Sequence, residues 1–305
     1  MKLNRFLIIA IVSVSIFSAC REDEGDTLAK HELVLEVSMG DTETRVTPEG
    51  TWTKGDLIAV KVGTTVKKYE IKEDGIARGY DATNTFYWED FDESSFTVSA
   101  WSFGKEYYDA IPDVITVKTD QTDDDDYSAS DFLYAKETTV SRETGARLIF
   151  CHQMGYMGLS ITMDDPTANI VSVTIGKEPD SDYKSCIIGA KYTKPTLDTE
   201  SGEIPDFGTF DFNEEEEMYN GIVTPHKWED ASGKVIYSAI LVPYFYESLS
   251  IVITLDDGTE YNFILGVSCN APEIKPGEKI LYNVSIRNQE ITVVNGPRIS
   301  VIDWQ

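Results

Sequence analysis

The chain has 305 residues, of which 41% are hydrophobic and 11% aromatic, and its 26 Lys+Arg against 53 Asp+Glu give a formal net charge of −27. The apolar content suffices for folded cores, so a disordered chain is excluded despite the charge. Nucleic acid is excluded as a partner, because binding to phosphates requires clustered Lys and Arg. At roughly 100–200 residues per domain, the length predicts two domains.

The N-terminus has the pattern of an export signal. A basic start precedes the apolar stretch 6–17, which is shorter than the roughly 20 residues needed to span a bilayer. The sequence Phe-Ser-Ala-Cys that ends at Cys20 resembles a bacterial lipobox. We therefore expect a signal peptide over 1–19, a lipid on Cys20, and an acidic tether over 20–31.

The other cysteines are few and widely spaced: Cys151, Cys186 and Cys269. This set does not imply a disulfide framework, although one pair could form, and it does not have the spacing of a metal cluster. We interpret these residues as buried thiols and leave their pairing open.

Short apolar runs that alternate with a period of two fill the rest of the chain. They lie at 31–38, 57–62, 96–101, 147–153, 157–163, 170–175, 250–255, 260–267 and 281–286. Asp257-Gly258 predicts a tight hairpin between two of these runs, because this dipeptide tolerates the positive φ of a primed turn. Since no window has the periodicity of a long helix, the fold class is predicted to be all-β and built of sandwiches.

A polar, turn-prone segment at 141–145 marks the predicted domain boundary. It separates an N-terminal β-sandwich domain over 32–144 from a C-terminal one over 145–305. The acidic stretches 120–131 and 213–217 are predicted to be exposed loops.

Few patterns point to catalysis or to metal binding. The adjacent Cys151 and His152 invite a nucleophile–base interpretation, but neighbouring strand residues face opposite sides, so His152 is predicted to be a packed side chain. The four aspartates from Asp123 to Asp126 could supply calcium ligands, yet they lack the spacing of a calcium loop, and a solvated loop is the preferred interpretation. No familiar catalytic motif occurs. We expect no enzyme and no cofactor; a carboxylate hydrolase stays open only because acidic residues are numerous.

An aromatic cluster supports an alternative function. Trp101, Phe103, Tyr107 and Tyr108 gather near one strand end and could form a platform on which sugars stack. Such residues more often serve as core and loop anchors. The alternative is a surface glycan-binding β-sandwich lipoprotein.

The order of motifs along the chain resembles the fimbrillin-like (type V pilin, Mfa-like) lipoproteins. The motifs are the lipobox at Cys20, Thr44-Arg45 before Trp52-x-x-Gly55-Asp56-x-Ile58-x-Val60, Asp131-Phe132-Leu133-Tyr134-Ala135, Leu148-x-Phe150-x-His152, Leu241-x-Pro243, Pro276-Gly277 with Tyr282-x-Val284-x-Ile286, and Ile302-x-Trp304. Each motif is weak, but their order covers nearly the whole mature chain.

The resemblance implies two transthyretin-like β-sandwich domains and a structural or accessory role in a surface pilus. In this family the subunit is exported as an outer-membrane lipoprotein, and a trypsin-like protease then cuts after an Arg, which removes the lipid and the first strand. On this sequence the cut falls between Arg45 and Val46 and removes 20–45, including the strand expected at 32–38.

A strand donated by the next subunit would fill the resulting groove, because removing an alternating strand leaves unpaired main-chain groups and a hydrophobic slot. The candidate donor lies in 290–304, where Asn295-Gly296-Pro297 separates two apolar runs. The resemblance leaves open whether the chain is a stalk, tip or anchor subunit, and which host or microbial surface ligand it contacts.

Overall fold

The computed structural model describes residues 30–40, 52–73, 75–165, 167–176, 186–212, 219–230, 233–266, 272–287 and 290–299. The predicted lipidation site Cys20, the predicted cleavage site at Arg45 and Val46, and Cys269 lie outside the described residues. In these ranges no helix is long and apolar enough to cross a membrane.

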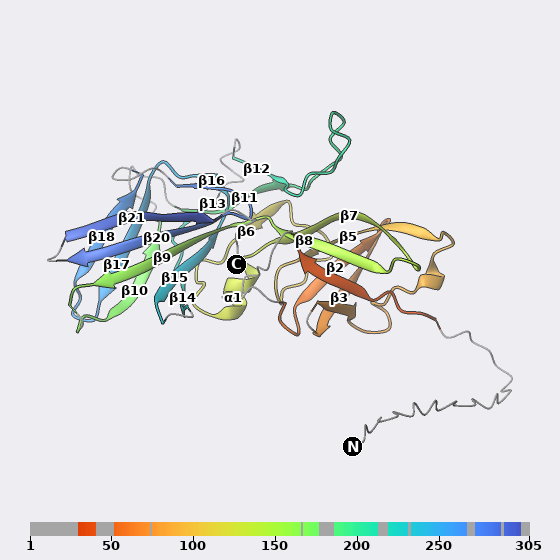
Figure 1. Cartoon of the computed structure of the whole chain (residues 1–305), viewed down its shortest axis with the longest axis horizontal. Helices are drawn as coiled ribbons and strands as arrows, with labels where there is room; N and C mark the ends of the chain where they lie inside the picture. The colour runs from red at the N-terminus through yellow and green to blue at the C-terminus, as the bar shows by residue number, and fades with distance from the viewer. Residues whose placement is uncertain are drawn as a thin grey trace, which may run out of the picture. The chain divides into compact units, whose positions relative to one another are not determined.

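The predicted all-β class is confirmed in its main feature: the described elements are mostly β-strands, with one short α-helix among them (Figure 1). The first elements are β1 (Leu35–Met39), β2 (Leu57–Val62), β3 (Thr65–Glu73), β4 (Ile76–Gly79), η1 (Trp88–Asp90), β5 (Ser95–Ser102), β6 (Val114–Thr116), α1 (Asp124–Ala129), β7 (Leu133–Ser141) and β8 (Ala146–His152). The others are β9 (Gly155–Met163), β10 (Ile170–Ile175), β11 (Cys186–Thr193), β12 (Thr209–Asp211), β13 (Tyr219–Gly221), β14 (His226–Glu229), β15 (Val235–Leu241), β16 (Tyr244–Phe245), β17 (Leu249–Leu255), β18 (Glu260–Leu265), β19 (Glu273–Ile274), β20 (Lys279–Arg287) and β21 (Glu290–Ile299).

Hydrogen bonding closes the N-terminal strands into a barrel. Its order is β1-β4-β3-β2-β5-β7-β8, and β8 returns to β1. Alternate side chains of these strands, among them Leu35, Ile58, Val60 and Phe150, belong to one buried core. The sequence predicted a β-sandwich here, and the observed ladder closes because β1 pairs with both β4 and β8.

The predicted domain boundary falls in a hairpin of this barrel. The turn at 142–145 joins β7 to β8, and these strands pair with each other at Leu133–His152 and Tyr134–Cys151. Since β8 also pairs with β1, a division into domains at 144/145 would separate hydrogen-bonded strands. The division stays a prediction, and the pairing favours a boundary after β8.

The C-terminal strands form several smaller sheets. One sheet has the order β14-β15-β9-β20-β21, and its strands β9, β20 and β21 lie side by side in Figure 1. A second sheet has the order β10-β17-β18, a third contains β12-β11-β13 with β6 also paired to β11, and β16 pairs with β19. β6 lies between the barrel strands β5 and β7 in the sequence but pairs with β11 of a C-terminal sheet. The described residues from His31 onward therefore belong to one compact unit.

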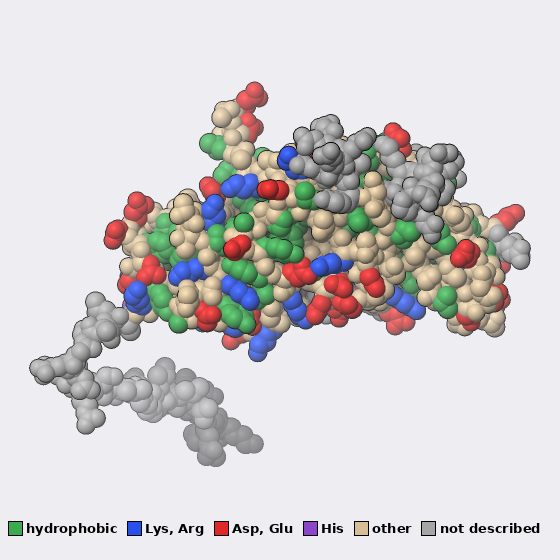
Figure 2. Space-filling view, turned by 180° about the vertical axis from the view of Figure 1, so that it is seen from behind, with side chains coloured by type: hydrophobic (Ala, Val, Ile, Leu, Met, Phe, Trp, Pro, Cys, Tyr) green, Lys and Arg blue, Asp and Glu red, His purple; other side chains and the backbone are tan. Residues whose placement is uncertain are grey.

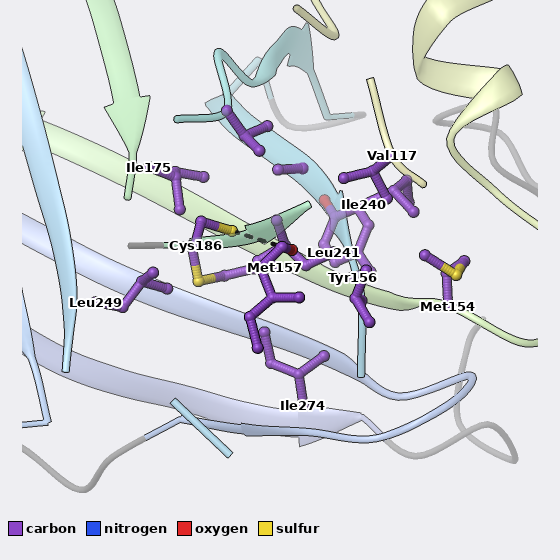
Figure 3. Packing of buried hydrophobic residues seen from close by; sticks show 14 of the residues in the cluster. Val117, Met154, Tyr156, Met157, Ile175, Cys186, Ile240, Leu241, Leu249 and Ile274 are labelled. Carbon is purple, nitrogen blue, oxygen red and sulfur yellow. Dashed lines mark hydrogen bonds between the residues drawn. The ribbon is translucent and has the colours of Figure 1, made fainter. Parts of the chain in front are cut away.

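Side chains from separate sheets meet in a second core, shown in Figure 3. Met157 of β9, Leu241 of β15, Leu249 of β17 and Cys186 of β11 are all fully buried there. Burial raises the pKa of the Cys186 thiol to about 12, so this thiol stays protonated. Neither Cys186 nor the half-buried Cys151 forms a disulfide, which agrees with the interpretation of these two residues as thiols.

The alternating runs predicted from the sequence correspond to β1, β2, β5, β8, β9, β10, β17, β18 and β20. The predicted hairpin is also confirmed. β17 and β18 pair from Leu249 opposite Leu265 to Thr254 opposite Glu260, and Gly258 has a φ of 85° at the turn.

The acidic stretch 120–131 differs from the predicted exposed loop, because it contains α1. The Asp123 carboxylate accepts a hydrogen bond from the Asp126 N–H at 2.8 Å and so caps the helix N-terminus. Tyr127 and Ala129 on this helix are buried. A solvated loop is therefore the wrong description of these residues.

Candidate functional site

β1 fills a position between two strands that are distant in sequence. It runs parallel to β8 over five residue pairs, from Leu35 opposite Ala146 to Met39 opposite Phe150. On its other side it is antiparallel to β4, with pairs at Leu35 and Glu36. β1 therefore completes the barrel by hydrogen bonding on both of its edges.

The inward face of the N-terminal segment is apolar. Leu33 and Leu35 are 0% exposed and Val37 is 5% exposed, whereas Glu36 points to solvent. Burying each such side chain stabilises a fold by about 1.5–3 kcal/mol, so the three together contribute roughly 5–9 kcal/mol as an upper estimate. The barrel would lose this contribution if the segment left.

Main-chain hydrogen bonds extend the attachment upstream of β1. The Leu33 N–H donates to the Phe86 carbonyl at 2.8 Å, and the Trp88 N–H donates to the His31 carbonyl at 2.9 Å. The buried Tyr69 hydroxyl donates to the Leu33 carbonyl at 3.0 Å. Burial raises the pKa of Tyr69, so this hydroxyl stays a donor.

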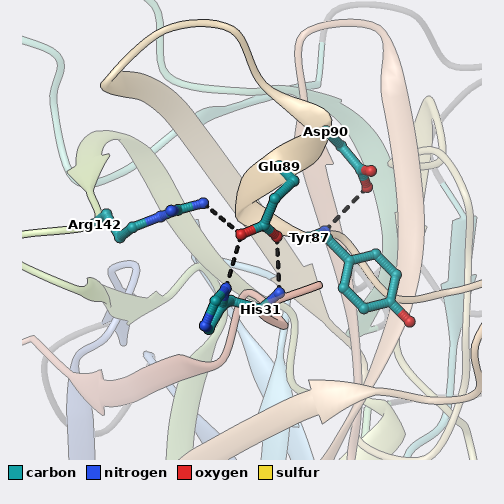
Figure 4. A network of polar contacts seen from close by, with 5 residues as sticks. All are labelled: His31, Tyr87, Glu89, Asp90 and Arg142. Carbon is teal, nitrogen blue, oxygen red and sulfur yellow. Dashed lines mark hydrogen bonds and ion pairs between the residues drawn. The ribbon is translucent and has the colours of Figure 1, made fainter. Parts of the chain in front are cut away.

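The Glu89 carboxylate ties the start of this segment to two other parts of the barrel (Figure 4). Its Oε2 accepts the His31 main-chain N–H at 2.7 Å, and its Oε1 lies 2.8 Å from His31 Nδ1. Oε1 also accepts a hydrogen bond from the Arg142 guanidinium at 2.7 Å. The hydrogen bonds from His31, with a smaller effect of the Arg142 charge, lower the pKa of Glu89 to about 2. His31, Glu89 and Arg142 form the Glu89 cluster.

A second carboxylate holds the same segment on the side of β4. The Glu32 Oε2 lies 3.0 Å from Arg78 Nη1, and its Oε1 accepts the Gly79 N–H at 3.2 Å. Both partners belong to β4. The residues before β1 are thus held by polar contacts on two sides, at η1 and at β4.

The residues on either side of the interval that contains the predicted cleavage site both contact Phe150 of β8. The Gly40 N–H donates to the Phe150 carbonyl at 2.8 Å. On the other side of the interval, the buried Trp52 ring packs edge-on against the Phe150 ring, with 5.1 Å between centroids. A cut within 41–51 would therefore separate β1 from Trp52, and each would still contact Phe150.

The candidate donor segment has a different structure from the one predicted. β21 is continuous over Glu290–Ile299, so Asn295-Gly296-Pro297 does not separate two runs there. It pairs antiparallel with β20 from Arg287 opposite Glu290 to Lys279 opposite Ile299, with one register shift. Residues 290–299 of the predicted donor thus form a strand in the chain's own sheet, and 300–304 lie outside the described residues.

His152 is packed as predicted, but its partner was not foreseen. Its Nδ1 lies 2.7 Å from Asp131 Oδ2, and the two side chains are 6% and 1% exposed. The partners are 21 positions apart, and nothing in the local sequence pairs them. Asp131 was expected in an exposed loop, and its burial corrects that expectation.

The candidate calcium ligands do not converge. Asp123 caps α1, and Asp131 faces His152. Among the described residues, no group of three or more His, Cys, Asp or Glu side chains could hold a metal ion.

The predicted sugar-stacking platform is wrong for two of its rings. Trp101 and Phe103 are each 4% exposed and belong to the second core. The Trp101 indole N–H donates to the Tyr108 carbonyl at 2.9 Å, which fastens the following loop, and Tyr108 itself is 39% exposed. These rings therefore act mainly as core and loop anchors.

Fold and site together define a mostly-β protein whose barrel is completed by its own N-terminal strand. The profile of the fimbrillin-like family matches residues 44–304, and the chain belongs to that family. No curated protein matches the chain.

Three solved structures share the fold, each described as a candidate cell adhesion protein. The Bacteroides ovatus structure has a TM-score of 0.59 at 19% identity, covering 88% of this chain and 96% of its own. The Bacteroides uniformis structure has a TM-score of 0.58 at 17% identity, covering 87% and 96%. The Bacteroides fragilis structure has a TM-score of 0.50 at 11% identity, covering 87% and 97%. At these identities the likeness concerns the fold alone.

Proposed function

We propose that this protein is a structural or accessory subunit of a cell-surface pilus. It is exported as a lipoprotein with the lipid on Cys20 and held at the outer membrane. A protease then cuts between Arg45 and Val46, and copies assemble by donation of a strand. Membership of the fimbrillin-like family supports the pilus role, and the signal sequence supports export.

The position of β1 is the observation that carries this proposal. The strand lies N-terminal to Arg45, buries a continuous apolar row, and is hydrogen-bonded on both edges. Its removal would leave facing edges on β4 and β8 together with an empty hydrophobic slot. A strand from another copy can satisfy both, which is the physical basis of β-augmentation.

Because the copies are strongly acidic, assembly needs a favourable contribution that outweighs their repulsion, and filling the hydrophobic slot left by β1 would supply it. Copies cut after Arg45 each keep a formal charge of −24, because residues 1–45 carry 5 Lys+Arg and 8 Asp+Glu of the full-length −27, and such copies repel one another on approach. A donated strand that restores three buried apolar positions offsets this repulsion, since each such position contributes about 1.5–3 kcal/mol. The acidity would then keep unassembled subunits apart and soluble.

The proposed donor is 290–304. Ile291 and Val293 alternate on β21 and pack against the second core, so the segment already has the pattern of a groove-filling strand. Donation would require β21 to leave β20, which means that assembly includes a rearrangement of the C-terminal sheet.

An Arg-specific protease tests the proposal on the purified full-length precursor. We expect the product to begin at Val46, to lose the 20–45 fragment, and to form oligomers in size-exclusion chromatography. Arg45→Lys keeps the charge but removes the recognition site, and Arg147→Lys, an exposed arginine of β8, is the matched control. Oligomers that form equally well from Arg45→Lys would overturn the cleavage step.

N-terminal sequencing of the protein from the native cell surface separates the subunit types. A start at Val46 would indicate an assembled, processed subunit, whereas an acylated Cys20 would indicate an anchor subunit. Deletion of the gene without any change in surface filaments by electron microscopy would contradict the pilus role.

A further inference from the structure

The two ends of the β1 segment, defined as residues 31–40, are held differently in the barrel. At its start, the main chain at 31–33 forms hydrogen bonds with residues 86–89 and with the Tyr69 hydroxyl of β3. At its end, the Gly40 N–H donates to a carbonyl of β8. The segment is therefore fastened to several parts of the barrel at its start and to one strand at its end.

Pairing with β4 covers only the first half of the strand. β1 pairs with β4 at residues 35–36, and the Val37 N–H donates to the Gly75 carbonyl at 2.8 Å. Beyond Val37, the main-chain partners of 38–40 that the structure describes are on β8 alone. Residues bonded on a single edge open at a lower free-energy cost than residues bonded on both edges.

Burial of the apolar row also declines toward the end of the segment. Leu33 and Leu35 are fully buried and Val37 is nearly so, whereas Met39 is half-buried where it packs against the barrel core. A half-buried side chain loses less hydrophobic stabilisation when it leaves the core. The last residues of the segment are therefore the easiest to detach.

Two carboxylates fasten the start of the segment. Glu89 contacts the main chain and the ring of His31, and Glu32 contacts Arg78 and a main-chain N–H of β4. These contacts are partly exposed, so each one alone is weak. All of them, together with the main-chain hydrogen bonds of Leu33, must break before this end can leave.

The proposed cut after Arg45 acts on the more weakly held end. In the intact chain this end continues to Trp52, whose buried ring contacts Phe150. After a cut, the same end would be a chain terminus, so residues 38–40 could separate from β8 without moving Trp52. The contacts at the start of the segment are unaffected by the cut.

The surface beside the end of the segment is partly apolar. Ile149 of β8 is 51% exposed, and a Cβ added at Gly40 would lie 3.2 Å from its side chain. Acidic side chains are spread over the visible face of the molecule in Figure 2, so two copies repel over much of their surfaces. An exposed apolar side chain at this point offers an incoming strand a first favourable contact.

We propose that the exchange of β1 for a donated strand is directional. The incoming strand binds first along β8 at the place of residues 38–40 and then displaces the β1 segment toward His31. The contacts of Glu89 and Glu32 break last. This inference rests on the strand exchange proposed above, and it specifies where on the barrel the partner strand begins to bind.

The test uses the full chain with a thrombin site inserted after Arg45, so that it does not depend on natural processing. After the cut, synthetic peptides 35–45 and 30–38 of this chain are added, each with three apolar residues of the barrel core. Peptide 35–45 should speed release of the resident fragment in proportion to its concentration, as measured by mass spectrometry. Peptide 30–38 should leave the release rate at its value without peptide, because it lacks the residues that bind first.

A substitution at the start of the segment separates binding from release. Glu89→Gln should speed release of the fragment about fivefold, as expected for weakening of partly exposed charge-assisted hydrogen bonds. It should leave the initial binding rate of fluorescent peptide 35–45 unchanged in anisotropy measurements. Glu93→Gln, an exposed neighbour, is the matched control and should change neither rate. Circular dichroism melts before the cut establish that each variant is folded.

A disulfide can fasten the other end. A Cβ added at Gly40 would lie 2.9 Å from the Cys151 sulfur, so Gly40→Cys should form a disulfide with Cys151 on oxidation. Oxidation should block binding of peptide 35–45, and reduction should restore it. Equal binding to the oxidised and reduced forms would contradict entry at this end.

Three results of the peptide experiment would overturn the proposal. They are equal acceleration by both peptides, acceleration by 30–38 alone, and a release rate that neither peptide changes. The last result would mean that β1 leaves completely before a new strand enters. Ordered exchange in the thrombin-cut chain, with an Arg45 that is never cut on the native cell, would refute the cleavage step and leave this inference standing, so the two proposals fail separately.

Discussion

Glu89 accepts a hydrogen bond from the main chain of His31 and also contacts the His31 ring, at 2.7 and 2.8 Å, although the two residues are 58 positions apart. This relationship fixes the chain just before the strand that completes the barrel. It is supported by Arg142, which approaches the same carboxylate from the turn between β7 and β8.

The first prediction concerns the acid sensitivity of this contact. The pKa of Glu89 is lowered from 4.5 to about 2, so its ionised form stabilises the fold fully above pH 4.5 and loses this effect as the pH falls toward about 2. Glu89→Gln should raise hydrogen exchange at 31–34 a few-fold at neutral pH, and this difference from the unsubstituted protein should vanish near pH 2. Glu93→Gln, an exposed neighbour, is the control. A difference that grew on acidification would contradict the assignment.

The second prediction concerns the apolar face of β1. Leu35→Ala should lower the free energy of unfolding by about 2–4 kcal/mol in urea titrations, because it removes a fully buried side chain and leaves a cavity. Glu36→Ala, at the neighbouring exposed position, should change it by less than about 0.5 kcal/mol. Equal effects of the two substitutions would mean that β1 does not close the barrel.

The third prediction concerns the buried pair of Asp131 and His152. Asp131→Ala should cost about 3–5 kcal/mol in chemical unfolding, because it leaves a buried polar partner without its counterpart. His152→Ala should cost less in the Asp131→Ala background than in the unsubstituted protein. Additive costs would show that the two side chains do not interact, and Asp125→Ala, which is exposed, serves as the reference.

The fourth prediction uses the thiols as reporters of β1. Cys151 is half-buried next to Gly40, where an added Cβ would lie 2.9 Å from its sulfur, whereas Cys186 is fully buried and its pKa is raised to about 12. Release of residues 20–45 should therefore speed alkylation of Cys151 by iodoacetamide and leave Cys186 unreactive, as measured by mass spectrometry of peptides. Unchanged labelling of Cys151 after loss of the fragment would contradict the packing of Gly40 on β8.

Local sequence patterns predicted the elements that have a local sequence signature. The hairpin of β17 and β18 followed from alternation and Asp257-Gly258, and β1 followed from its apolar row at Leu33, Leu35 and Val37. The alternation and the turn dipeptide are visible within a few consecutive residues, although the strands that pair with β1 are not.

Features that depend on distant partners could not be predicted in the same way. Helix α1 has six residues and no helical periodicity, and it is held by a cap at Asp123 and by packing of Tyr127 against His226. β21 continues through Pro297, which would normally end a strand, because it lies at the end of its sheet and pairs with β20 on one side. The Glu89 cluster is likewise assembled from separate parts of the chain.

The parallel orientation of β1 and β8 sets the direction of any array built from this barrel. A strand that replaces β1 in the same register must run the same way as β8. The accepting surface of each copy is then different from the surface it donates, so the contact is head-to-tail rather than two-fold symmetric. Where the rotation between copies does not close a ring, such a contact repeats into a filament that has two chemically distinct ends.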